Sequence, residues 1–262
     1  MIVDKDKCVN ILGVPTGIYT MGTLVARIEE LIAAPGCAVG HGVNAHVLNL
    51  TYHHPEFLKA LRQADLLYAD GASLLLASRL LGSHLPEKLT TTDVWPKLCE
   101  IAVQKKYRFY LLGGEPGLAE RAASQARDKY PGLHIVGTQH GYFDFRDEHI
   151  IAEINAASPD ILWVGMGDPR QLLWSIKWRQ QLEVSLVLTC GGMFKIVAGE
   201  LERLSPTLRQ NGFEWAYRLW QEPATWRRYL VGLPLFGARV LAQALNDGER
   251  LFKSGHKSTS AR

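Results

Sequence analysis

The sequence has 262 residues, a formal net charge of +3, 47% apolar residues and 21% charged residues. This composition excludes a disordered or collagen-like chain, and the length predicts one large domain or one domain with an appendage. The four cysteines form no CxxC pair and no run of eighteen apolar residues occurs, so no metal-ligand spacing, disulfide framework or transmembrane helix is expected. The polar N-terminus also gives no sign of a signal peptide.

Strands and helices alternate along the first 192 residues. Apolar runs that end at glycine or a small polar cluster predict strands, and apolar residues at helical spacing predict helices. We expect strands at 9–14, 37–43, 66–69, 108–112, 134–138, 161–166 and 185–189. The expected helices cover 20–32, 47–52, 55–63, 72–81, 94–105, 118–130, 148–157 and 172–181. This alternation is typical of an α/β fold with a mostly parallel sheet and helices on both faces.

The character of the chain changes after Gly199. Residues 203–245 are helical in pattern, and aromatic side chains alternate with arginines. Such a segment suits an anionic lipid surface, with rings at headgroup level and arginines on phosphates; the alternative is a helical subdomain packed on the core. We therefore expect a core (1–199), a helical, arginine- and aromatic-rich appendage that docks on a membrane (200–252), and a disordered polar tail (253–262).

Asp70 follows the apolar run Leu66–Ala69 and precedes Gly71. An acidic side chain at the carboxyl end of such a strand lies where ligands bind in open α/β sheets. A carboxylate held there can act as a general base on an acceptor hydroxyl. The alternative is an aspartate that forms the turn and caps the next helix.

The stretch Gly113-Gly114-Glu115-Pro116-Gly117 joins a predicted strand to a predicted helix. Glycines let the backbone approach an anion and a helix N-terminus favours negative charge, so the stretch suits a phosphate, although such a turn also uses glycine for geometry alone. The Walker sequence is missing and no Asp-x-Asp pair falls at a strand end, so the pattern requires no metal. If a diphosphate leaves, the C-terminal arginines are the groups expected to neutralise it.

Short motifs along residues 10–230 resemble, in order and separation, one family of bacterial glycosyltransferases. The main ones are Asn44-Ala45, Ala69-Asp70-Gly71, Thr92-Asp93, Leu112-Gly113-Gly114, Gly141-Tyr142-Phe143, Gly165-Met166-Gly167-x-Pro169-x-Gln171, Gly191-Gly192 and Glu214-Trp215-x-Tyr217-Arg218. The family is the WecG/TagA/CpsF type, which includes N-acetylmannosaminyl and N-acetylmannosaminuronic acid transferases and the xanthan glucosyltransferase.

This resemblance implies a Rossmann-like core and an inverting sugar transfer, independent of metal or other cofactor. The donor is a UDP-sugar and the acceptor a polyprenyl-diphosphate-linked sugar in surface or exopolysaccharide biosynthesis. The resemblance also implies a cytoplasmic protein, peripheral on the inner face of the cytoplasmic membrane. No nucleic-acid partner is expected, and self-association as a homo-oligomer stays open.

In the family the aspartate of the Ala-Asp-Gly motif is the favoured catalytic base, which is Asp70 here. The substrate-binding residues expected from the resemblance and the strand ends are Asn44, His46, Thr92, Asp93, Gly113, Gly114, Gln171, Gly191, Gly192, Arg203, Arg218 and Arg228.

The chain departs from the usual family pattern around the expected pocket. Gly42 stands where many members have Thr, and His46 where they have Glu. Lys195 stands where they have Asp, and Glu202 replaces a basic residue. The donor therefore stays open between a UDP-N-acetylmannosamine type and UDP-glucose.

Two alternatives come from other classes. A nucleotide-dependent oxidoreductase shares the alternating pattern, but the first strand is not followed by Gly-x-Gly-x-x-Gly. A non-catalytic, membrane-associated protein that binds lipid-linked sugars is distinguished by the absence of turnover.

Overall fold

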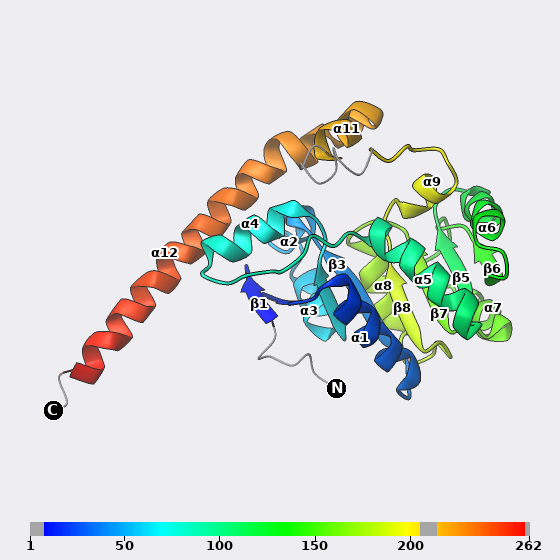
Figure 1. Cartoon of the computed structure of the whole chain (residues 1–262), viewed down its shortest axis with the longest axis horizontal. Coiled ribbons are helices and arrows are strands. Elements are labelled where there is room, and N and C mark those ends of the chain that lie inside the picture. Colours follow the sequence, from blue (N-terminus) through cyan, green and yellow to red (C-terminus); the bar gives the residue numbers. More distant parts are fainter. Residues whose placement is uncertain (1–7, 205–213, 260–262) are drawn as a thin grey trace.

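A computed structural model describes residues 8–204 and 214–259 of the chain, with side chains as far as residue 247. Its strands form one twisted sheet with helices on both faces (Figure 1). They are β1 (Cys8–Ile11), β2 (Val14–Gly17), β3 (Ala38–Val43), β4 (Leu66–Ala69), β5 (Arg108–Gly113), β6 (His134–Gln139), β7 (Ile161–Gly165) and β8 (Leu186–Thr189). The strand order is β1-β2-β4-β3-β8-β7-β5-β6.

Among these strands, β1 and β2 pair antiparallel and every other neighbouring pair is parallel. The predicted α/β fold with a mostly parallel, Rossmann-like sheet is therefore confirmed. In the core the helices are α1 (Met21–Ala33), α2 (Ala45–Leu50), α3 (Pro55–Gln63), α4 (Ala72–Leu80), α5 (Thr91–Lys105), α6 (Leu118–Lys129), α7 (His149–Ala157), α8 (Arg170–Trp178) and α9 (Met193–Val197). The C-terminal segment holds α11 (Glu214–Gln221), the 3₁₀ turn η2 (Pro223–Thr225), the π-helical turn η3 (Arg227–Val231) and α12 (Gly232–Thr259).

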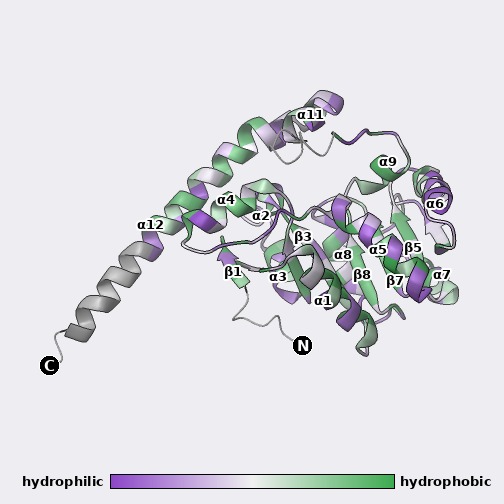
Figure 2. Ribbon diagram, viewed as in Figure 1, coloured by the Kyte–Doolittle hydropathy of each residue, from purple (hydrophilic) through white to green (hydrophobic). Residues whose placement is uncertain are grey.

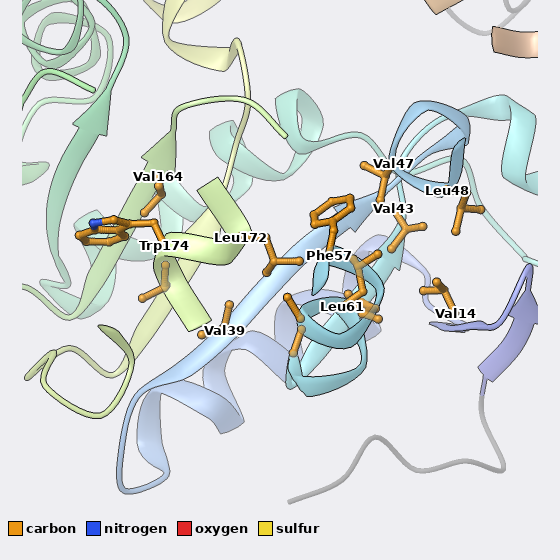
Figure 3. Close-up of a cluster of buried hydrophobic side chains, with 14 of the residues drawn as sticks. Val14, Val39, Val43, Val47, Leu48, Phe57, Leu61, Val164, Leu172 and Trp174 are labelled. Atoms are coloured by element: carbon orange, nitrogen blue, oxygen red, sulfur yellow. The ribbon is translucent and has the colours of Figure 1, made fainter. Parts of the chain in front are cut away.

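Each face of the sheet carries its own hydrophobic cluster, because successive strand residues point to opposite faces. On one face Phe57 of α3 and Leu172 of α8 pack over Val39 of β3 (Figure 3). On the other face the rings of Trp95 in α5 and Trp163 in β7 lie 5.0 Å apart. Burial on both sides explains why the strands read as continuous apolar runs.

The single strand predicted at 9–14 is a hairpin of β1 and β2 instead. Its two turn residues, Leu12 and Gly13, have φ angles of 51° and 83°. Positive φ at both positions is what a two-residue hairpin turn with the right twist requires. Because leucine is an unusual residue at such a position, the Leu12-Gly13 pair is a weaker hairpin signal than Asn-Gly or Asp-Gly.

The C-terminal helix α12 packs on the core beside α2 and α4 (Figure 1). Phe236 and Val240 are buried in the same cluster as Phe57. The Gln243 side chain bridges to the hairpin: its Nε2 donates to Asn10 O at 3.0 Å and its Oε1 accepts from the Leu12 amide at 2.8 Å. The segment is thus fastened to the sheet edge at several points.

The helix α12 continues to Thr259, whereas the sequence predicts a disordered tail from residue 253. Extending a helix that is already nucleated costs far less than starting one, so a polar segment can follow a packed helix in helical form. The expected division into core, appendage and tail stays a prediction.

Candidate active site

The carboxyl ends of four neighbouring strands line one cavity of about 460 Å³. The strands β4, β3, β8 and β7 lie side by side in the sheet, so the residues that follow them meet at one edge. The cavity is lined there by Asn44 and His46 after β3, Asp70 after β4, Asp168 and Gln171 after β7, and Gly191 and Gly192 after β8.

The backbone around Asp70 is fixed between two elements. Its amide donates to Val43 O at 2.7 Å, and the Gly71 amide donates to Leu89 O at 2.8 Å. Gly71 has a φ of 104°, which only glycine adopts without strain, and it opens α4. The half-buried Asp70 side chain is therefore held at the cavity wall by backbone that cannot shift easily.

Gly42, one of the positions where the chain departs from the family pattern, lies directly beside Asp70. A Cβ added to Gly42 would lie 3.2 Å from Asp70 Cβ and 3.1 Å from both Thr91 Oγ1 and Tyr68 Oη. Those two hydroxyl oxygens are themselves hydrogen-bonded at 2.7 Å. A side chain at this position would therefore fit only if Asp70, Thr91 or Tyr68 shifted by a few tenths of an ångström.

Asn44 begins α2 and presents its side chain to the cavity. Its Oδ1 accepts hydrogen bonds from the amides of His46 (3.0 Å) and Val47 (3.1 Å), which is the geometry of a helix N-cap. With the oxygen committed to the helix, the carboxamide nitrogen is the part of the Asn44 side chain that could donate a hydrogen bond to a ligand.

Gln171 joins the loops after β7 and β8. Its Nε2 donates to Asp168 Oδ1 at 2.9 Å, and its Oε1 accepts from the Gly191 amide at 2.9 Å. The side chain is 3% exposed, so both ends of a buried carboxamide are satisfied. Gln171 thereby fixes the position of Gly191 at the cavity wall.

His46 lies between a cation and an anion. Burial lowers the pKa of His46 to about 4; the positive charge of Arg228 lowers it as well, and Asp168 acts in the opposite direction. The imidazole is consequently neutral near pH 7, where it can either donate or accept a hydrogen bond.

The C-terminal segment supplies the side of the cavity that faces the strand ends. Its lining residues are Trp215, Arg218, Arg228, Tyr229 and Leu233. The rings of Trp215 and Tyr229 lie 6.4 Å apart. Both arginines therefore lie at the same cavity as Asp70, although more than 140 residues separate them in sequence.

Glu222 holds Arg218 in place. Its Oε2 lies 2.9 Å from Arg218 Nε, and its Oε1 lies 2.7 Å from Lys195 Nζ in α9. Burial opposes ionisation of Glu222, but the hydrogen bonds and charges of Lys195 and Arg218 outweigh it and lower the pKa of that carboxyl. A Cβ on Gly192 would lie 2.9 Å from Arg218 Nη2, so the guanidinium rests directly on the glycine loop.

Two expected site residues pair with each other rather than lining the cavity. Arg203 donates to Thr92 O at 2.9 Å and to Asp93 Oδ1 at 2.8 Å. The other Asp93 oxygen accepts from Thr90 Oγ1 at 2.5 Å, at the N-terminus of α5. Asp93 and Arg203 thus hold the start of α5, whose Thr92 does line the cavity.

Gly113 and Gly114 also lie outside the cavity lining. Gly113 ends β5 and Gly114 follows it, and β5 is separated from β8 by β7. The Gly114 amide donates to Gly165 O at 3.0 Å, and a Cβ on Gly113 would lie 2.3 Å from that same oxygen. Gly113 thus packs closely against the neighbouring strand end, and a Cβ on Gly114 would lie 2.5 Å from the Leu118 side chain. The expected role of both glycines in binding a substrate stays a prediction.

The remaining expected residues do line the cavity: Asn44, His46, Asp70, Thr92, Gln171, Gly191, Gly192, Arg218 and Arg228. Their roles stay predictions. Sequence reasoning missed Asp168, Lys88 and Trp215, which also line it. Asp168 and Trp215 each stand inside a motif quoted for the resemblance, so that motif was the available signal.

Within residues 8–204 and 214–259, no group of three or more His, Cys, Asp or Glu residues is arranged to hold a metal ion. In the same part of the chain no helix has the length and apolar character needed to cross a bilayer. The expectation of a metal-independent reaction stays a prediction.

A mostly parallel α/β sheet with a cavity at its strand ends, lined by Asp70 and by two arginines of the C-terminal segment, is an arrangement that suits an enzyme with an anionic ligand. Comparison with known proteins identifies the family of the chain. The chain matches the model of the glycosyl transferase WecG/TagA/CpsF family over residues 9–250, and it belongs to that family. The resemblance noted from its motifs is confirmed, and the chain is a glycosyltransferase.

Curated relatives include N-acetylglucosaminyldiphosphoundecaprenol N-acetyl-beta-D-mannosaminyltransferases of Staphylococcus aureus strains MW2, NCTC 8325 / PS 47 and MRSA252. Each is 28% identical over 236 residues, which is 88% of this chain and 91% of the relative. The similarity therefore extends over both the sheet and the C-terminal segment.

Proposed function

We propose that this protein transfers a sugar from a UDP-sugar to a polyprenyl-diphosphate-linked sugar in the synthesis of a bacterial surface or exopolysaccharide. The observation that carries the proposal is one cavity that holds Asp70 together with Arg218 and Arg228. The names of the staphylococcal relatives support it, because they describe transfer of an N-acetylmannosaminyl group to a diphosphoundecaprenol-linked sugar. The donor is of the UDP-N-acetylmannosamine type or UDP-glucose.

In the proposed reaction the acceptor hydroxyl attacks the anomeric carbon on the face opposite the departing UDP, so the configuration inverts. Asp70 takes the hydroxyl proton as the new glycosidic bond forms and the bond to the UDP oxygen breaks. The electron pair of that bond leaves with UDP. A carboxylate fixed by its backbone on a strand end suits this role, because the base has to be held within hydrogen-bond reach of the acceptor.

Negative charge that develops on the departing diphosphate is neutralised by Arg218 and Arg228. Arginine suits this task because its planar guanidinium donates two parallel hydrogen bonds to phosphate oxygens. The ion pair with Glu222 holds Arg218 against the glycine loop, so little reorganisation is needed when charge appears. No metal ion takes part in this scheme.

The C-terminal segment docks on the membrane surface and so holds the cavity close to the lipid-linked acceptor. Large apolar side chains are exposed on it and on neighbouring α4: Leu76, Leu80, Trp220, Trp226, Leu230, Val231, Leu235, Leu241 and Leu245. Figure 2 shows hydrophobic residues along α4 and the adjoining part of α12. The Arg227 guanidinium lies 5.3 Å from the Trp226 ring centre, a pairing that suits the headgroup region. The site of action is the inner face of the cytoplasmic membrane.

The experiment that tests the proposal is a UDP-release assay on the full chain. A panel of UDP-sugars is combined with polyprenyl-diphosphate-linked glucose or N-acetylglucosamine, with EDTA in a parallel arm. We expect acceptor-dependent release for one donor–acceptor pair, unaffected by EDTA. Release that stops with EDTA would contradict metal independence, and a complete lack of turnover despite UDP binding would favour a non-catalytic lipid-linked-sugar binder.

A further inference from the structure

Two ionisable side chains that have no role in the proposed mechanism lie next to each other at the strand-end side of the cavity. His41, on β3, is 1% exposed, and its Nδ1 lies 2.6 Å from Thr189 Oγ1 of β8. Its Nε2 is 3.7 Å from Asp168 Oδ1, and within the described part of the chain that buried nitrogen has no hydrogen-bond partner. Asp168 is 12% exposed in its side chain and lines the cavity.

The Asp168 carboxylate is held in a fixed orientation. Its Oδ1 accepts from Gln171 Nε2 at 2.9 Å, and the other end of that carboxamide is bound to the Gly191 amide. A carboxylate accepts several hydrogen bonds through its two oxygens. Because Gln171 holds one oxygen, the group is oriented before any ligand arrives and has capacity left for ligand hydroxyls.

The charge of Asp168 is not cancelled by the histidine behind it. Burial lowers the pKa of His41, and the attraction of Asp168 only partly opposes that effect. A neutral imidazole supplies no positive charge to offset that of the carboxylate. The cavity is lined by two strand-end carboxylates, Asp70 and Asp168, and by Arg218 and Arg228 of the C-terminal segment.

The loop that Asp168 braces also contacts the arginines assigned to the diphosphate. Gln171 ties Asp168 to Gly191, and Arg218 lies against the adjoining Gly192. Asp168 and Arg218 therefore border the same cavity and are linked through one glycine loop.

We propose that Asp168 binds hydroxyl groups of the donor sugar and makes the cavity select a neutral hexose over a hexuronic acid. Hydroxyls donate to a carboxylate in charge-assisted hydrogen bonds, whereas a carboxylate on the sugar would be repelled by a like charge that is fixed and largely buried. The inference rests on the proposed function, because it specifies the donor of that same reaction.

The test compares matched donors that differ only in the oxidation of the sugar C6: UDP-glucose with UDP-glucuronic acid, and UDP-N-acetylmannosamine with its uronic acid. For the full-length protein we expect the neutral member of the productive pair to have at least a tenfold higher kcat/KM. In Asp168→Asn, which keeps an oxygen to accept from Gln171, we expect that ratio to fall about tenfold. An unchanged ratio, or a wild-type preference for the uronic acid, would overturn the inference.

A matched control is Asp128→Asn, which removes the same charge from an exposed position on α6 outside the cavity lining; its donor ratio is expected to equal that of the wild type. If Asp168→Asn does not fold, Asp168→Ser gives a second neutral side chain for the same measurement.

Different measurements test the role of Asp168 and the proposed function, so that either can be rejected without the other. Binding of each UDP-sugar is measured by calorimetry alongside turnover. Lack of turnover with every donor counts against the proposed function alone, because the neutral-to-uronic ratio of binding constants still tests Asp168. A binding ratio that Asp168→Asn leaves unchanged overturns the inference even where turnover is normal.

Discussion

The strand-end loops of the core and the C-terminal helices line the same cavity, but they are held in different ways. Asp70 and Gln171 lie on loops tied to buried strands, where side chains such as Trp163 are fully enclosed. Arg218 and Arg228 lie on a segment where Trp220 is 75% exposed and Leu230 is 55% exposed. Elements with few buried contacts open most readily, so we infer that the chemistry is placed on the rigid part and charge neutralisation on the part that can move.

Among the residues that the structure describes, the two regions meet through hydrogen bonds, ion pairs and two buried apolar side chains. Lys195 of α9 and Arg218 share Glu222, and Asn49 of α2 donates to Gly232 O at 2.7 Å. Phe236 and Val240 carry the apolar part of the contact.

Removal of residues 200–262 tests the contrast most severely. Loss of Arg218 and Arg228 together is expected to lower UDP release on a lipid-linked acceptor by at least about 10⁴, since each electrostatic donor in such a site contributes about 10²–10³. The core is also expected to self-associate in size-exclusion chromatography, because the surface under Phe236 and Val240 becomes exposed.

The matched control ends the chain at Asp247 and so retains both arginines and the packed part of α12. It is expected to keep its activity within a few-fold of the intact chain. Full activity of the shorter core on the lipid-linked acceptor would contradict the role given to the C-terminal segment.

Asp70→Asn tests the core side of the contrast. Asparagine is close in shape but cannot take a proton, so turnover is expected to fall by about 10²–10⁴ while UDP binding persists. The measurements are UDP release and calorimetric binding, with a melting curve to verify the fold. The control is Asp128→Asn on exposed α6. Near-normal turnover of Asp70→Asn would remove this residue from the mechanism.

Substitution of Trp220, Trp226 and Leu230 by serine tests the exposed surface of the C-terminal segment. Affinity for vesicles that contain anionic phospholipid is expected to fall about tenfold or more, because each buried ring or aliphatic chain contributes about 1.5–3 kcal/mol. Co-sedimentation measures it. Tyr142→Ser, which removes a ring that is 71% exposed on the core, is the control; equal losses in both proteins would argue against a specific docking surface.

Lys195→Ala tests the link between the two regions. Its ion pair with Glu222 is partly exposed, and such pairs contribute about 0.2–1 kcal/mol. We expect kcat/KM to fall about two- to fivefold, because Glu222 is then held less firmly and positions Arg218 less well. The position of Asp70 is expected to stay the same. Lys97→Ala, which breaks the exposed pair with Glu100 on α5, is the matched control. A loss as large as that of Arg218→Ala would mean that Lys195 itself contacts substrate.

The smallest expected effect is the contribution of His46 to the pH dependence of the folding stability. The pKa of His46 is about 4 in the folded protein and about 6.5 in the unfolded chain. Between those values the unfolded chain binds more protons, so His46 contributes a loss of stability as the pH falls from about 6.5 to about 4. His46→Gln is therefore expected to gain in melting temperature relative to the wild type as the pH falls through that range. The exposed His149→Gln is the comparison, and parallel curves for His46→Gln and wild type would contradict the assignment.

Local residue patterns were sufficient to predict many of the helices and strands and the position of the main carboxylate. The spans predicted for α3 (Pro55–Gln63) and β4 (Leu66–Ala69) match the structure, and Asp70 lies at the strand end where the pattern put it. These features depend on residue periodicity and on proline and glycine at element ends, which act over a few residues. The β1–β2 hairpin was not predicted, because Leu12, which is not a typical turn residue, occupies one of its two turn positions.

The set of strand ends that share the cavity depends on the three-dimensional order of the strands and could not be predicted from local patterns. Strand order places β7 beside β8 and moves β5 one position outward, so Asp168 enters the cavity and Gly113 does not. The same holds for Arg203, which pairs with Asp93, and for Phe236, which is buried on the core. Strand order and helix docking follow from apolar surfaces far apart in sequence that fit one another, and no local pattern of residues encodes that fit.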